Sequence, residues 1–180
     1  MSEIAVPPVP AWLAHRPTLG GLVVPWITPQ ADDGRHLFGV LDPARQHAAL
    51  TGRLCQVCGR PLGKRLVLLM RWQDLPHRCT AEPGCDPQCC AYVQAACPMV
   101  AGRMSHYRST PPRLGPDMVH APDTAARLGK PAPVWFAVWL ADYRVVVDPR
   151  SGTLVASYAH PAAAHPPGQW VAPRRRLTAR

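Results

Sequence analysis

The chain of 180 residues fits one domain with tails, since domains commonly hold about 100–150 residues. A hydrophobic fraction of 47% suffices for a core, whereas 23 prolines and 13 glycines argue against long regular elements. No segment reaches the roughly 18 apolar residues that span a bilayer, which excludes a membrane-spanning helix, and a net charge of +9 favours acidic partners such as nucleic acid.

Residues 1–19 predict an extended, proline-rich arm, which Trp12 and Leu13 could anchor against the body. The sequence begins without the basic region and the continuous apolar region of a signal peptide. We therefore expect a cytoplasmic, reducing environment, in which cysteines are more often metal ligands, reactive thiols or buried small side chains than disulfides. The odd count of seven cysteines also argues against complete disulfide pairing.

Residues 22–28 predict a strand at a sheet edge, because the internal Pro25 cannot donate to a ladder. A turn signal at residues 32–34 precedes a second apolar run at residues 36–41. Together the two runs predict a β-hairpin.

Asp42-Pro43 predicts a sharp helix start, since aspartate caps free amides and proline suits the first helical position. This helix would end near Gly52 and deliver the chain to Cys55. Residues 66–72 then predict a strand, and residues 88–96 predict a short helix.

The segment 109–133 predicts a proline-rich loop with at most a turn of helix at residues 124–128. Three strands are expected after it, at residues 134–140, 144–147 and 153–158, and a turn at residues 148–152 makes a hairpin of the last two. The remaining residues to Arg180 predict a flexible basic tail.

Cys55-Gln-Val-Cys58-Gly59 has the spacing of a zinc knuckle, in which two thiolates three residues apart grip one ion. A lone Cys-x-x-Cys is also typical of a redox pair. A redox pair usually opens a helix after a strand, however, whereas this one follows a predicted helix. The spacing therefore favours zinc, which would supply folding energy that a proline-rich chain lacks.

Structural zinc requires four ligands in a tetrahedron. Cys85 and Cys89, four residues apart at the start of the second helix, are the favoured second pair, and Asp86 with Cys89 is a poorer alternative. Cys79 and His77 are reserves on the preceding loop. Cys97 lies about 12 Å beyond Cys89 along a straight helix, so we expect it to pack in the core, and Cys90 points away from Cys89.

The predicted fold is α+β, with small antiparallel sheet elements around a treble-clef-like zinc centre and flexible arms at both ends. Residues 1–19 form the arm, and residues 159–180 form the tail. Residues 20–158 form a single zinc-stabilised domain, with the zinc centre at about 53–98 and a C-terminal hairpin at about 133–158.

The spacing of several short motifs resembles a family of uncharacterised small zinc-knuckle proteins found in GC-rich bacteria and in their phages and mobile elements. The resemblance covers roughly residues 20–158. It rests on Asp42-Pro43, on Leu54-Cys55-Gln-Val-Cys58-Gly59-Arg-Pro-Leu62-Gly63, on Cys79 with Glu82-Pro83, on Asp86-Pro-Gln-Cys89-x-x-Tyr92 and on Ala96-Cys97-Pro98.

The family pattern has a histidine three residues before the helix cysteine, which implies a Cys-Cys-His-Cys zinc site. In this chain that position is Asp86. The resemblance implies that another residue replaces this histidine as the zinc ligand. The candidates are Cys85, Asp86 itself and Cys79.

The basic character belongs to the C-terminal part of the chain. Residues 1–100 carry nine Lys and Arg against seven Asp and Glu, whereas residues 101–180 carry eleven against four. A partner or nucleic-acid interface would use Arg103, Tyr107, Arg108, Arg113, Arg174, Arg175 and Arg176. Tyr107 could stack on a base. The alternatives are a solvated loop and the arginine usage of a GC-rich genome.

We therefore expect a non-enzymatic zinc-binding accessory protein that acts through protein or nucleic-acid binding, such as a phage or mobile-element regulator of recombination or transcription. A pure protein adaptor is the alternative, and a metal-dependent enzyme is less favoured because no His-Glu-x-x-His motif is present. No catalytic residue is assigned. The sequence names neither the partner nor the oligomeric state.

Overall fold

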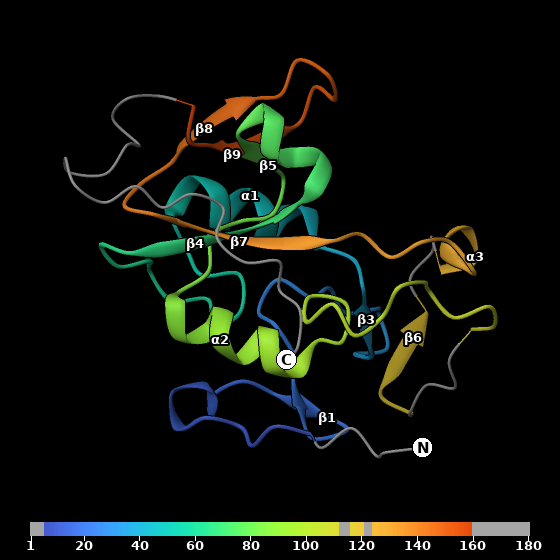
Figure 1. Cartoon of the computed structure of the whole chain (residues 1–180). Coiled ribbons are helices and arrows are strands. Elements are labelled where there is room, and N and C mark those ends of the chain that lie inside the picture. The colour runs from blue at the N-terminus through green and yellow to red at the C-terminus, as the bar shows by residue number, and fades with distance from the viewer. Residues whose placement is uncertain (1–5, 112–115, 121–123, 160–180) are drawn as a thin grey trace.

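A central antiparallel pair, β4 (Leu66–Arg71) and β7 (Trp135–Leu140), organises the molecule. The computed structural model describes residues 6–111, 116–120 and 124–159. The two strands pair along six residues, from Leu66 opposite Leu140 to Arg71 opposite Trp135. Figure 1 shows α1 (Pro43–Gly52) on one side of this pair and α2 (Pro87–Ala96) on the other.

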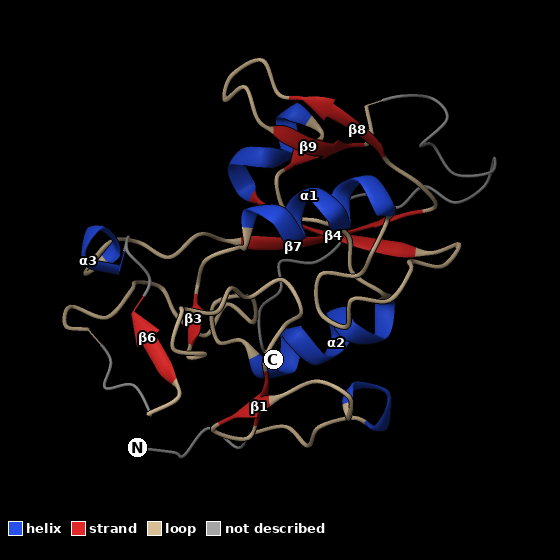
Figure 2. Ribbon diagram, turned by 180° about the vertical axis from the view of Figure 1, so that it is seen from behind, coloured by secondary structure: helices blue, strands red, loops and turns tan. Residues whose placement is uncertain are grey.

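Each face of the β4–β7 pair packs into a separate hydrophobic core, because successive side chains of a strand point to opposite sides. On one face, Leu66, Leu68 and Met70 pack with Leu50 of α1, and Figure 2 shows α1 running along this side. On the other face, Val67 and Leu69 pack with the cysteines and with α2. The strand β4 is therefore buried from both sides, as its unbroken apolar sequence requires.

A second sheet lies beyond α1 and has the strand order β5 (Cys79–Thr80), β9 (Leu154–Ser157), β8 (Arg144–Val147). The predicted hairpin of the last two strands is confirmed as β8 and β9. The preceding predicted strand forms as β7 but pairs with β4. The 3-10 helix η2 (Trp72–His77) carries the chain from β4 into β5.

Both predicted helices form and begin as expected. The side chain of Asp42 accepts a hydrogen bond from the Arg45 amide at 2.9 Å, and that of Asp86 accepts from the Gln88 amide at 2.8 Å. Each helix has proline at its first turn. The helix α1 ends at Arg53 in the left-handed conformation, with φ of 54°. The buried hydroxyl of Tyr143, which follows β7, donates to the Leu50 carbonyl at 3.0 Å.

The segment before α1 differs from the prediction. Residues 11–23 pack along α2 as η1 (Ala11–Leu13) and the strands β1 (Thr18–Leu19) and β2 (Leu22–Val23), which pair with each other. Of the two predicted anchors, Leu13 is fully buried, whereas Trp12 is 41% exposed.

The predicted hairpin between residues 22–28 and 36–41 forms only near its turn, where an antiparallel bridge joins Gln30 to His36 and the Leu37 amide donates to the Pro29 carbonyl at 3.0 Å. After Pro25, the amides of Trp26 and Ile27 donate to the carbonyls of Val57 and Gln56, at 2.8 and 3.0 Å. The carbonyls of the cysteine knuckle therefore accept the hydrogen bonds of both amides. The strand β3 (His36–Phe38) pairs instead in parallel with β6 (Met118–His120), a strand that the sequence did not predict.

The described chain is an α+β fold, as expected. The predicted turn of helix in the long loop is present as α3 (Thr124–Arg127). Within the described ranges, no helix has the length and apolar character needed to cross a membrane. The predicted tail lies outside the described residues, except for Ala159.

Candidate metal centre

The segment that contains Cys55 and Cys58 folds into a tight knuckle. The Gly59 amide donates to the Cys55 carbonyl at 2.8 Å, and the Cys55 amide donates to the Arg60 carbonyl at 2.8 Å. A bridge between Leu54 and Pro61 closes the base of the turn. Because these bonds hold the backbone in a loop, the two thiols are presented together, as the spacing predicts.

Gly59 is required at this turn for two reasons. Its φ is +76°, a conformation that residues with a Cβ adopt only with strain. A Cβ at this position would also lie 2.7 Å from the ring of Trp26. That ring has the guanidinium of Arg45 5.7 Å from its centroid, and Arg45 donates to the Trp26 carbonyl at 2.6 Å. The indole therefore has little freedom to move away.

The helix α2 brings a third thiol to the knuckle. The Sγ atoms of Cys55, Cys58 and Cys89 all lie within 4.8 Å of one another. Their residues are 0%, 8% and 1% exposed. Three converging, buried sulfurs form a group that could hold a metal ion.

Cys85 lies beside this group but is not part of it. Its backbone pairs with Val67 of β4 through two hydrogen bonds, of 2.8 and 2.9 Å, and its side chain is fully buried. Interaction with the Cys55 thiol, together with burial, raises the pKa of Cys85 well above its usual range. The predicted fourth ligand is therefore adjacent to one member of the three-sulfur group.

Cys55 is the member of the group whose pKa the surrounding donors lower. Hydrogen bonds from the thiols of Cys85 and Cys89 lower the pKa of Cys55, and the Asp86 amide adds to this effect. That amide donates to the Cys55 Sγ at 3.3 Å. Donors aimed at sulfur stabilise a thiolate, which is the form that binds metal.

The other predicted ligand candidates occupy different places. The Asp86 carboxylate caps α2, while Cys79 lies in β5 with the Arg150 guanidinium 3.9 Å from its Sγ. His77 is an exposed residue of η2. Cys90 is a buried residue of α2, and Cys97 is half-buried at the end of that helix. All seven cysteines are free of disulfides.

Comparisons of the chain with protein-family models, with curated proteins and with solved structures find no match. The site is therefore interpreted from its own residues.

Three of the predicted contact residues lie in the described segment that follows α2. Arg103 and Arg108 are exposed, and Tyr107 is half-buried. The Arg103 guanidinium donates to the Ala95 carbonyl near the end of α2, at 2.8 Å. The remaining candidates, Arg113, Arg174, Arg175 and Arg176, lie outside the described residues.

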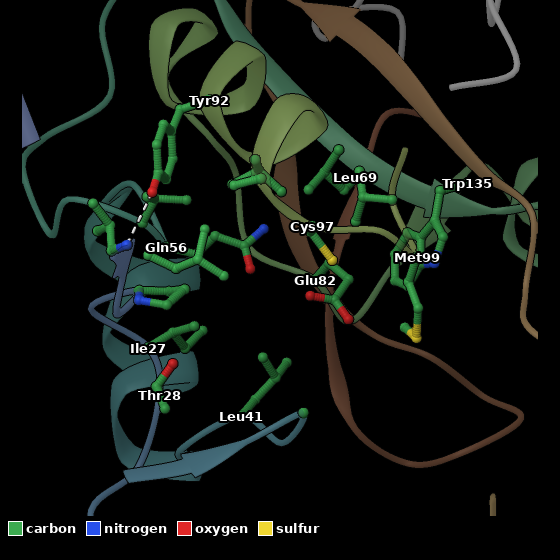
Figure 3. A pocket seen from close by; sticks show the side chains of 18 of the residues that line it. Ile27, Thr28, Leu41, Gln56, Leu69, Glu82, Tyr92, Cys97, Met99 and Trp135 are labelled. Atoms are coloured by element: carbon green, nitrogen blue, oxygen red, sulfur yellow. Dashed lines mark hydrogen bonds between the residues drawn. The ribbon is translucent and has the colours of Figure 1, made fainter. Parts of the chain in front are cut away.

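A pocket of about 320 Å³ adjoins the centre, and the sequence did not indicate it. Figure 3 shows it between α2, the knuckle and the end of the β4–β7 pair. Its lining is mainly apolar but includes Glu82, whose pKa burial raises to about 7. The indole Nε1 of Trp135, also in the lining, is buried and has no hydrogen-bond partner in the described part of the chain. Trp135 was predicted only as a strand residue, and Glu82 entered the sequence analysis only as part of the motif Glu82-Pro83, without a functional role.

The contact between Gly59 and Trp26 generates a first prediction. Gly59→Ala should lower the free energy of unfolding by about 2–4 kcal/mol, because left-handed strain and overpacking add. Gly63→Ala is the matched control, since a Cβ there meets no atom within 4 Å, and it should change stability by less than about 0.5 kcal/mol. Urea unfolding of both variants measures the difference. Equal stabilities would refute the role assigned to the turn.

Glu82 generates a prediction about pH. Its pKa rises from an ordinary value of 4.5 to about 7 on folding, so between these values the native state binds more protons than the unfolded state. Stability contributed by this group is therefore lost as pH rises from about 5 to 8. Glu82→Gln should remove this loss. The free energy of unfolding of the variant should therefore rise relative to that of wild type by on the order of 2–3 kcal/mol across that interval.

Thermal or urea unfolding at both pH values tests this expectation. Asp117→Asn, which changes an exposed carboxylate, serves as the control and should show no such pH-dependent gain. If the free energies of unfolding of Glu82→Gln and wild type differed by the same amount at pH 5 and pH 8, the role assigned to Glu82 would be contradicted.

Proposed function

We propose that the chain is a non-enzymatic, zinc-binding accessory protein that acts through binding to protein and nucleic-acid partners. The observation that carries the proposal is the convergence of three buried sulfurs, those of Cys55, Cys58 and Cys89, within 4.8 Å of one another. A metal held there would be enclosed by protein, which is the character of a structural centre. Catalytic zinc, in contrast, keeps an open position.

Zinc is the metal that this donor set fits best. Four thiolates at about 2.3 Å from a tetrahedral ion lie about 3.8 Å from one another, a spacing within the limit that the three sulfurs meet. Sulfur donors in a tetrahedron favour zinc over the harder ions calcium and magnesium. Cys85 supplies the fourth thiolate in the proposal, since its side chain already contacts Cys55.

The order of elements supports a treble-clef-like arrangement. A closed knuckle contributes Cys55 and Cys58, a strand follows it, and the first turn of α2 contributes Cys89. Such a centre contributes folding free energy, since the ligands come together only in the native state. This contribution suits a chain with 23 prolines, since proline limits regular hydrogen-bonded elements.

The binding role is supported by the charge of the surface beyond α2. Arg103 and Arg108 are exposed there, in a stretch without an acidic residue from 87 to 116. Such a surface attracts phosphate groups through charge alone. A regulator of recombination or transcription, encoded by a phage or mobile element, is the biological setting that we propose for such contacts.

One observation favours the second candidate, a protein adaptor without nucleic-acid contact. Trp72 is 68% exposed, and its ring packs against Phe136 with 5.8 Å between centroids. Val134, whose carbonyl accepts the Trp72 amide, is also exposed. Exposed aromatic side chains are enriched at protein interfaces.

Metal analysis tests the zinc centre. Purified wild-type protein should contain one zinc per chain, and Cys55→Ser and Cys89→Ser should lose the metal together with most of their stability. Cys97→Ser, which changes a half-buried thiol outside the group, should retain both. Cys85→Ser should lower zinc affinity as strongly as Cys89→Ser if Cys85 is the fourth ligand. A wild type that folds stably without metal would overturn the proposal.

Salt-dependent binding separates the two candidates. A nucleic-acid binder should bind a mixed-sequence DNA duplex at about 50 mM salt, and its affinity should fall steeply as salt rises. The double variant Arg103→Ser/Arg108→Ser should reduce the slope of log affinity against log salt by about 2, with one unit lost per phosphate contact. Arg65→Ser/Arg144→Ser, which removes two exposed arginines elsewhere, is the control. No binding at low salt would leave the adaptor role.

A further inference from the structure

The pocket beside the metal centre has the size and lining of a ligand site. Its volume of about 320 Å³ falls within the range of about 300–1,000 Å³ that is typical of small-molecule clefts. Apolar side chains from four parts of the fold line it, among them Ile27, Val57, Leu69 and Val93. Figure 3 shows these walls enclosing a common space.

Hydrogen bonds between distant segments fix the pocket walls. The Tyr92 hydroxyl accepts from the Val23 amide at 2.9 Å, and the Gln56 side-chain amide donates to the Pro83 carbonyl at 2.8 Å. Tyr92 and Gln56 both line the pocket. These two bonds hold Tyr92 and Gln56 in place, so their side chains shape the space in the absence of a ligand.

Two other polar groups of the lining lack such partners. The Trp135 indole Nε1 is a buried donor without an acceptor in the described part of the chain, and its residue is only 9% exposed. The Glu82 carboxyl group forms no hydrogen bond or ion pair there, whereas nearby Asp74 pairs with Arg71 at 3.1 Å. In Figure 3, Glu82 and Trp135 lie on the side of Cys97 and Met99, away from Ile27 and Leu41.

We propose that this pocket binds a small amphipathic molecule with an apolar or aromatic body and an uncharged amide head group. An amide carbonyl accepts the hydrogen bond that Trp135 offers, and an amide N–H donates to Glu82. A hydrocarbon leaves both groups unpaired, an amine leaves the indole unpaired, and a carboxylate meets a second negative charge. The inference does not depend on the proposed partners of the protein.

The protonation state of Glu82 does not change this choice. Burial raises the pKa of Glu82 to about 7, so both of its forms are present near neutral pH. An amide matches either form, since it donates to the carboxylate and accepts from the carboxylic acid. An amine and a carboxylate each match one form alone.

Four probes with one aromatic body distinguish the head groups: 2-phenylacetamide, phenylacetate, phenethylamine and ethylbenzene. Each is titrated at pH 8 into the full-length, zinc-loaded protein, and indole N–H resonances are followed by NMR. Fragments of about ten heavy atoms bind with roughly millimolar affinity. We expect 2-phenylacetamide to bind about threefold to tenfold more tightly than the other three, the effect of one well-made hydrogen bond, and to shift the Trp135 N–H resonance.

Two variants assign the contacts. Trp135→Phe keeps an aromatic wall but removes the N–H, so it should weaken 2-phenylacetamide about threefold to tenfold and leave ethylbenzene unchanged. Trp139→Phe, on the same strand but outside the pocket lining, is the control. Glu82→Gln removes the charge, so phenylacetate should bind more tightly to it than to wild type, a gain that misfolding cannot produce.

Three results would overturn the proposal. Equal affinities for ethylbenzene and 2-phenylacetamide would show that the polar groups make no contact with the ligand. Tightest binding of phenethylamine would show that Glu82 alone selects the ligand, as a site for amines. No shift with any probe at about 10 mM, well above the expected dissociation constants, would show that the pocket binds no such molecule.

Discussion

The convergence of Cys55, Cys58 and Cys89 is the constraint on which the rest of the structure depends. The knuckle that holds two of these sulfurs also accepts the amides of Trp26 and Ile27, which fixes the segment before α1. The third sulfur fixes α2. Cys85 extends the same centre to the sheet, because its backbone pairs with β4. Four segments far apart in the sequence therefore meet at one cluster of thiols, and a metal ion that joins the sulfurs would stabilise all four contacts together.

The composition of the chain explains why such a centre is needed. Among the described residues, only β4 and β7 pair over six residues, while β1, β2 and β5 contain two residues each. Short strands and proline-bounded turns leave few backbone hydrogen bonds to sustain cooperative folding. The apolar residues compensate in part, since β4 is buried on both faces and contributes to two cores at once. The cysteine centre lies in one of these cores, on the side where the β1–β2 hairpin and α2 provide the cover.

Local signals in the sequence predicted what local chemistry determines. The Asp-Pro pair at 42–43 marked the start of α1, and Cys55-Gln-Val-Cys58-Gly59 predicted the turn that forms, whereas the cap that Asp86 provides for α2 was not predicted. Features that depend on distant pairing were missed. The predicted strand through Pro25 ends at Val23, and the amides of Trp26 and Ile27 donate to the knuckle, so this segment forms no ladder with residues 36–41. Parallel pairing of β3 with β6 joins segments about eighty residues apart, and no periodicity within three residues can indicate it.

The pocket could not be predicted for the same reason, yet two of its walls adjoin the group of cysteines. Gln56 and Val57, between the two knuckle cysteines, line one wall, and Tyr92 and Val93, one helical turn after Cys89, line another. The spacing of the sulfurs therefore sets the spacing of the walls. The unpartnered Trp135 N–H costs about 1–3 kcal/mol when buried, and the raised pKa of Glu82 shows a second destabilising group in the same space. Folded proteins retain such costs mainly at sites that serve a function. A metal ion bound by the sulfurs beside the pocket would supply stability that offsets them.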